Sequence, residues 1–120
     1  MKKEETLPIS FSEAARLLAV SSRTVRRLVD QGHFTPVKVG FMLAIRVSDL
    51  PQAKGAQSKR DDVRPLMTVH DVAAQLTCSP SAVRELSARG DLRALDVGGS
   101  KRWSADEVEA FADRMSRNDR

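Results

Sequence analysis

The sequence is poor in the residues that crosslink small proteins or bind metals. Its 120 residues include one cysteine, Cys78, two histidines, His33 and His70, one tryptophan and no tyrosine. A single cysteine excludes an intramolecular disulfide, and the isolated histidines do not combine with it at the spacing of a metal site. We therefore expect structural or incidental roles for these residues, and neither a metal nor a cofactor.

The sequence also lacks the patterns of enzymes and of membrane proteins. It has no paired carboxylates, Ser/His/Asp set or phosphate-binding loop at a usable spacing, and Gly98-Gly99 alone is a turn signal. No stretch approaches the roughly 20 apolar residues of a membrane span, and the charged start leads into no apolar signal sequence. We expect a cytoplasmic protein with no catalytic residues and no membrane partner.

An excess of positive charge is present, and it is unevenly distributed. The formal net charge is +4 and the isoelectric point is about 9.7. Residues 1–52 carry eight Lys or Arg against five acids, residues 53–65 four against two, and residues 66–120 eight against nine. This distribution favours a polyanionic partner that meets the first half of the chain and the middle segment.

The chain contains an internal repeat. Residues 10–50 and 68–108 align without a gap at a shift of 58 residues, counted from Gly32 to Gly90. Most of the matched positions are apolar or glycine, so the repeated information is a fold. Two copies fit tandem domains better than a stacked array, which needs about three units or more. We therefore predict two modules joined by a linker, with boundaries at 1–52, 53–65 and 66–120.

Each copy opens with an expected short helix. Ser10 stands three residues before Glu13, the spacing at which each side chain caps the other residue's backbone N–H. Thr68 and Asp71 occupy the same positions in the second copy, where the shorter Asp should make the poorer capping box.

A second helix follows after a tight three-residue turn. Ser21 and Ser79 are expected to cap its start, and Gly32 and Gly90 its end. The apolar spacing i, i+3, i+4 marks its buried stripe, which consists of Val25, Leu28 and Val29, and of Val83 and Leu86. Helix, turn, helix is a helix-turn-helix arrangement.

A two-stranded hairpin, or wing, is expected next in each copy. Its strands are residues 34–39 and 44–47 in the first copy, and 92–97 and 102–103 in the second. A last helix should start at Ser104 and turn Val108, Phe111 and Met115 inward, with Trp103 in the core. Its equivalent in the first copy should start over residues 48–51. The expected fold class is mainly α with small β wings (α+β), as a tandem winged helix-turn-helix.

These residues resemble a known family, the MerR-like winged helix-turn-helix of phage and plasmid excisionases and their small excisionase-type regulators. The resemblance rests on Ser12-Glu-Ala-Ala15, Thr24-Val-Arg-Arg-Leu-Val29 and Pro36-Val-Lys-Val-Gly40, followed by a wing and a helix start at Asp49-Leu50 or Asp106-Glu-Val108. It covers nearly the whole chain, once per copy.

The resemblance implies that the second helix enters the major groove and that the wing lies along the backbone or the minor groove. The expected DNA contacts of the first copy are Ser22, Arg23, Thr24, Arg26 and Arg27. Those of the second copy are Ser81, Arg84 and Arg89, and its wing adds Ser100, Lys101 and Arg102.

A plainer interpretation stays open for part of this surface. Arg26 is placed to pair with Asp30 in an ordinary solvated face, and Lys54, Lys59 and Arg60 either track phosphates or keep the linker soluble.

The first wing departs from the family pattern. Phe41, Met42 and Leu43 stand where basic residues are expected. Exposed, they would be a poor DNA contact and a plausible protein contact. Packed on the second module, they would be core.

Two functional hypotheses follow. The first is a sequence-specific protein for double-stranded DNA, an excisionase or recombination directionality factor or a transcriptional regulator of a mobile element or phage. It would act as a monomeric pseudo-dimer or a cooperative assembly on the nucleoid, with an integrase or RNA polymerase as a further partner. The second, supported by the acidic residues of the second copy, is a protein-interaction module acting as an antiactivator or antirepressor.

Overall fold

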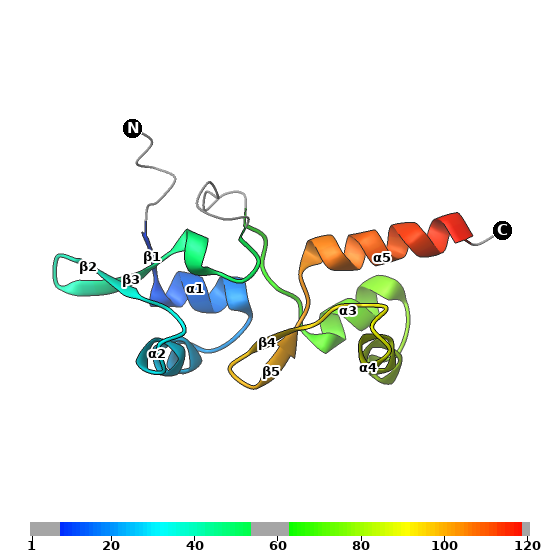
Figure 1. Ribbon diagram of the computed structural model, residues 1–120, viewed down its shortest axis with the longest axis horizontal. Helices are drawn as coiled ribbons and strands as arrows, with labels where there is room; N and C mark the ends of the chain where they lie inside the picture. Colours follow the sequence, from blue (N-terminus) through cyan, green and yellow to red (C-terminus); the bar gives the residue numbers. More distant parts are fainter. Residues whose placement is uncertain (1–7, 54–62, 119–120) are drawn as a thin grey trace. The chain divides into compact units, whose positions relative to one another are not determined.

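The computed structural model describes residues 8–53 and 63–118, in two compact units, residues 1–65 and 66–120 (Figure 1). Each described unit combines short helices with a small antiparallel sheet. The expected α+β class with small β elements is therefore confirmed.

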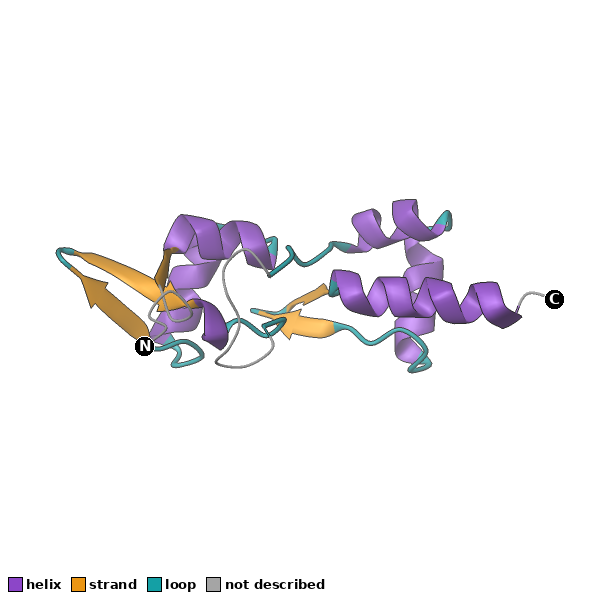
Figure 2. Ribbon diagram, turned by 90° about the horizontal axis from the view of Figure 1, so that it is seen from above, coloured by secondary structure: helices purple, strands orange, loops and turns teal. Residues whose placement is uncertain are grey.

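The first unit contains two helices beside a three-stranded sheet of order β1-β3-β2. The register pairs Ile9 of β1 with Ile45, and Val39 of β2 with Met42. The hairpin β2–β3 extends beyond the two helices of this unit (Figure 2). Its elements are β1 (Pro8–Ser10), α1 (Phe11–Leu18), α2 (Ser22–Asp30), β2 (Pro36–Val39), β3 (Met42–Arg46) and the 3₁₀ turn η2 (Val47–Asp49).

The second unit contains three helices and a two-stranded hairpin. A further bridge joins Met67 to Trp103, whose backbone groups exchange hydrogen bonds of 2.7 and 3.0 Å. Its elements are α3 (Val69–Leu76), α4 (Pro80–Ala88), β4 (Leu95–Val97), β5 (Ser100–Arg102) and α5 (Ala105–Asn118).

The start of each helix pair follows from local capping. The Ser10 hydroxyl accepts the N–H of Glu13 at 3.0 Å, and the Ser21 hydroxyl accepts that of Thr24 at 3.1 Å. Between the two helices Ala19 adopts a left-handed conformation with φ of 59°. This residue ends α1 and makes the turn tight, as the spacing predicts.

The capping box of the second unit is complete. Asp71 accepts the Thr68 N–H at 3.0 Å, and Thr68 accepts the Asp71 N–H at 3.2 Å. The expectation of a poorer box there is wrong, because the shorter carboxylate still reaches back. In the first unit the Glu13 carboxylate also accepts two bonds from Arg16, at 3.1 and 2.6 Å.

Residues 58 positions apart share unusual backbone conformations. Thr77, like Ala19, has φ of 59°. Gly32 and Gly90 have φ of 89° and 87°, each just after the second helix of its unit. The same local geometry therefore recurs at the same shift as the sequence repeat.

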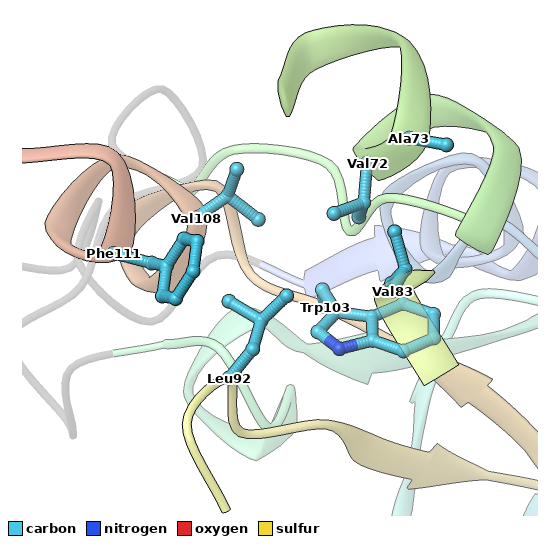
Figure 3. Packing of buried hydrophobic residues seen from close by; sticks show 7 residues of the cluster. All are labelled: Val72, Ala73, Val83, Leu92, Trp103, Val108 and Phe111. Carbon is cyan, nitrogen blue, oxygen red and sulfur yellow. The ribbon is translucent and has the colours of Figure 1, made fainter. Parts of the chain in front are cut away.

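The core of the second unit is a cluster of apolar side chains around Trp103, which is 1% exposed (Figure 3). The indole N–H donates to the Ser87 hydroxyl at 2.9 Å, so the buried polar atom has a partner. The expectation of Trp103 as core is confirmed. Its neighbours in the cluster are Val72, Ala73, Val83, Leu92, Val108 and Phe111.

The last helix of each unit differs from the expected one. In the first unit it is the single turn η2, because Pro51 restricts Leu50 to an extended conformation with ψ of 140°. In the second unit α5 runs past the core. Residues 112–117 of this helix are all exposed. Met115, which is expected inside, is therefore 52% exposed.

The segment predicted as a linker contains a buried residue. Val63 is 8% exposed, and the Gln52 side chain donates to the carbonyls of Leu17 at 2.8 Å and Arg64 at 3.1 Å. The boundary between the units accordingly falls at Pro65 and Leu66.

Replacing Ser21 by alanine removes the cap of α2. We expect the free energy of unfolding of the first unit to fall by about 1 kcal/mol, because the Thr24 N–H loses its acceptor. Urea denaturation followed by circular dichroism measures this. Ser21→Asp should retain the stability, and Ser12→Ala, at an exposed position of α1, is the matched control. Equal losses for Ser12→Ala and Ser21→Ala would contradict the capping role.

Candidate nucleic-acid interface

The outward face of α2 is strongly cationic. Val25 and Leu28 are buried against the unit, which turns the opposite side of the helix to solvent. Three arginines lie there with a single acid. The exposed set is Ser22, Arg23, Arg26, Arg27 and Asp30. Four of the five residues predicted for this helix are thus brought together on one surface.

Thr24, the fifth, is half-buried at the start of α2. Its N–H and its hydroxyl both lie 3.1 Å from the Ser21 hydroxyl. Thr24 therefore serves the helix cap and is only partly accessible to a ligand.

Arg26 is positioned by an aromatic ring. Its guanidinium lies 5.5 Å from the centroid of Phe11, at the start of α1. Arg26 and Asp30 are both exposed, and within residues 8–53 and 63–118 no ion pair joins them. A guanidinium held over a ring loses less freedom when it binds a ligand.

The cation of α1 is already neutralised. Arg16 forms an ion pair of 2.6 Å with Glu13, and its hydrogen bond to that carboxylate raises the pKa of the guanidinium, with the negative charge adding to the effect. We therefore expect Arg16 to contribute little to ligand binding.

The equivalent face of α4 carries less positive charge. Ser81, Arg84 and Glu85 are exposed on it. Arg89, which caps the helix end, donates to the Asp91 carboxylate at 2.8 Å. Arg89 is among the DNA contacts expected from the sequence. Its ion pair with Asp91, two residues later, is not part of that expectation.

A groove of about 950 Å³ lies between α4 and β5 in the second unit. It brings together Arg84 with Ser100, Lys101 and Arg102, all predicted contacts, and does not include Ser81 or Arg89. Sequence reasoning missed Arg93, which also lines the groove. The available signal was its place beside buried Leu92 in an extended segment, where alternate side chains point outward.

The wing of the second unit turns at two glycines. Gly98 and Gly99 have φ of 60° and 89°, and positive φ at both central residues is the requirement of a type I′ turn. The Gly99 N–H donates to the Asp96 carboxylate at 2.9 Å. This holds the adjacent Ser100 and Lys101 beside the groove.

The wing of the first unit ends in an apolar tip, which we define as Val39, Phe41, Met42 and Leu43. Phe41 is 102% exposed and Met42 67%. Leu43 and Val39 are 43% and 49% exposed. Within the first unit these side chains are not part of the core, because the four-pair hairpin carries them beyond the buried part of the sheet.

In the part of the chain that the structure describes, no three His, Cys, Asp or Glu side chains gather in a way that would hold a metal ion. Nor does any of the described helices have the length and apolar character to cross a membrane. Cys78 is exposed. Lys54, Lys59 and Arg60 lie outside the described residues.

Comparison with known proteins identifies the first unit's arrangement. Residues 9–52, which contain α1, α2, β2, β3 and η2, match the family described as a helix-turn-helix domain. The comparisons with curated proteins and with solved structures each found no match. The match supports a DNA-binding helix-turn-helix protein with double-stranded DNA as its partner.

Proposed function

We propose that this protein binds double-stranded DNA sequence-specifically, with α2 as the helix that enters the major groove. One observation carries the proposal: the residues matching the helix-turn-helix family place Arg23, Arg26 and Arg27 on the exposed side of its second helix. Such a helix fits the width of the major groove. The family match and the charge therefore favour the same ligand.

The arginines of α2 have two possible tasks on DNA. An arginine aimed at a base edge donates two bonds to guanine O6 and N7, whereas one at the rim neutralises phosphate. The guanidinium of Arg26 lies over the Phe11 ring, which restricts the direction in which it can donate hydrogen bonds. We assign base readout to Arg26 and phosphate contacts to Arg23 and Arg27.

We propose that the second unit is a second copy of the same winged module. The shared conformations at positions 58 apart support this, as does the cationic groove between α4 and β5. Arg84, Ser100, Lys101 and Arg102 would contact the duplex there, with Ser81 and Arg89 at the margin. Two recognition helices in one chain would read successive major grooves about 34 Å apart, as a pseudo-dimer.

The biological role proposed is that of an excisionase or a transcriptional regulator of a mobile element or phage. Its resemblance to excisionase-type modules supports this, and the helix-turn-helix match is consistent with it. An integrase or RNA polymerase would then be a further partner on the nucleoid.

A gel-shift titration with salt tests the proposed function. We expect a discrete complex with DNA from around the protein's own gene that survives competitor DNA. If about five phosphates are neutralised, log Kobs should fall against log salt with a slope of about −4 to −5. A folded protein that forms no such complex would contradict DNA binding and favour the protein-interaction module.

A further inference from the structure

The apolar tip of the first wing is not explained by major-groove binding through α2. The hairpin β2–β3 is drawn in Figures 1 and 2. Phe41 is fully exposed at its end, where the last pair is Val39 with Met42. Strand β3 has five residues where β5 has three, so this wing is the longer of the two. A large side chain at a protruding, hydrogen-bonded tip is accessible to a ligand.

The side of the unit on which the tip lies follows from the second unit. At the shift of 58 residues Met42 corresponds to Ser100, Leu43 to Lys101 and Arg26 to Arg84. Ser100, Lys101 and Arg84 line one groove between wing and helix. The chain turns from helix to wing at Gly32 and Gly90 with nearly the same φ, and both wings have the same register, with Val39 paired to Met42 and Val97 to Ser100. We therefore expect the apolar tip and Arg26 to border one face of the first unit.

The charge around the tip also suits a polyanion. The hairpin from Pro36 to Arg46 contains two cations, Lys38 and Arg46, and no acid. Both cations are exposed, one on each strand. An apolar end flanked by positive charge on the side of a cationic helix matches the combination that minor-groove proteins use, in which Phe, Met or Leu enters a base step and cations contact the phosphates.

We propose that the apolar tip is a wedge, with Phe41 inserting between base pairs in the minor groove of the bound duplex and Met42 supporting it. Insertion partly unstacks one base step and kinks the DNA away from the wing. The proposal rests on the proposed function and adds a second contact to it: α2 recognises the site, and the tip deforms it.

DNA bending by the Phe41→Ala variant tests the wedge. The probe is a duplex carrying the footprinted site, labelled at both ends for energy transfer, and the protein is kept at saturating concentration. The wild type should bend the duplex by roughly 20–90°. Phe41→Ala should reduce the angle at least twofold while Kd rises less than about tenfold, because the contacts of α2 remain. Permanganate reactivity of the unstacked step should disappear with the bend.

Two further variants control the experiment. Phe41→Leu keeps an apolar wedge and should bend DNA like the wild type. Met115→Ala removes an exposed apolar side chain, 52% accessible, from α5 and should change neither quantity. Since Phe41 is fully exposed in a turn, its replacement leaves the core intact, which circular dichroism verifies.

The failures of the two proposals are distinguishable. If Phe41→Ala binds and bends DNA like the wild type, the wedge is excluded, the proposed function stands, and the tip is a protein contact. If the wild-type protein binds no DNA at all, the proposed function fails and the wedge fails with it.

Discussion

Replacing Trp103 by alanine should unfold the second unit while the first stays folded. The indole is 1% exposed in the middle of a cluster of seven side chains. Truncating such a residue costs about 3–5 kcal/mol. A unit of residues 66–120 buries only a small core and has little more stability than that. The Ser87 hydroxyl also loses the bond from the indole nitrogen.

Urea denaturation followed by circular dichroism, with limited proteolysis, measures this effect. We expect the variant to lose the signal of the second unit's three helices and to be cleaved between residues 66 and 120, with the first unit protected. Trp103→Phe should lose much less stability. Met115→Ala, at a 52% exposed position, should leave the transition unchanged. An unaltered transition for Trp103→Ala would refute the assignment of the core.

Removing two arginines from α2 should nearly abolish DNA binding without weakening the fold. In the Arg23→Ala/Arg27→Ala variant we expect Kd to rise about 100-fold or more, because each hydrogen bond to a charged phosphate contributes roughly 1.5 kcal/mol. If both contact phosphates, the salt slope should become less steep by about two. Both side chains are exposed on α2, so their removal should leave the core of the first unit intact.

The matched control removes the same charge elsewhere. Arg16→Ala/Arg117→Ala takes away two exposed arginines that are ion-paired with Glu13 and Asp113. We expect this variant to bind DNA within a few-fold of the wild type. If both double variants lose affinity equally, net charge alone governs binding and α2 is not the recognition helix.

Most of the features that could be predicted from the sequence depend on local patterns. The serines that cap α2 and α4 accept hydrogen bonds from N–H groups three residues away. The glycines that follow these helices adopt a positive φ, which depends only on the residue itself. Interactions this short depend on spacing alone. The helices, the turn between them and the internal repeat were therefore visible in the chain itself, and so was the set of cations on the exposed face of α2.

Contacts between distant residues were not visible in the same way. Strand β1 pairs Ile9 with Ile45. A strand of three residues has no local sequence pattern that predicts it when its partner lies so far away in the sequence. The addition of Arg93 to the cationic groove required the fold of the second unit. Whether Arg26 would pair with Asp30 or lie over Phe11 likewise depended on how α1 and α2 pack.

The sequence by itself thus determined the helix-turn-helix elements, their caps and turns, and a cationic helix, because these depend on neighbours within a few residues. The tertiary structure alone decided that Arg26 lies over the Phe11 ring and that the apolar tip of the first wing is exposed. Exposure and pairing depend on what the rest of the fold places beside a residue. The physical reason is that burial and long-range contacts exist only once the chain has packed.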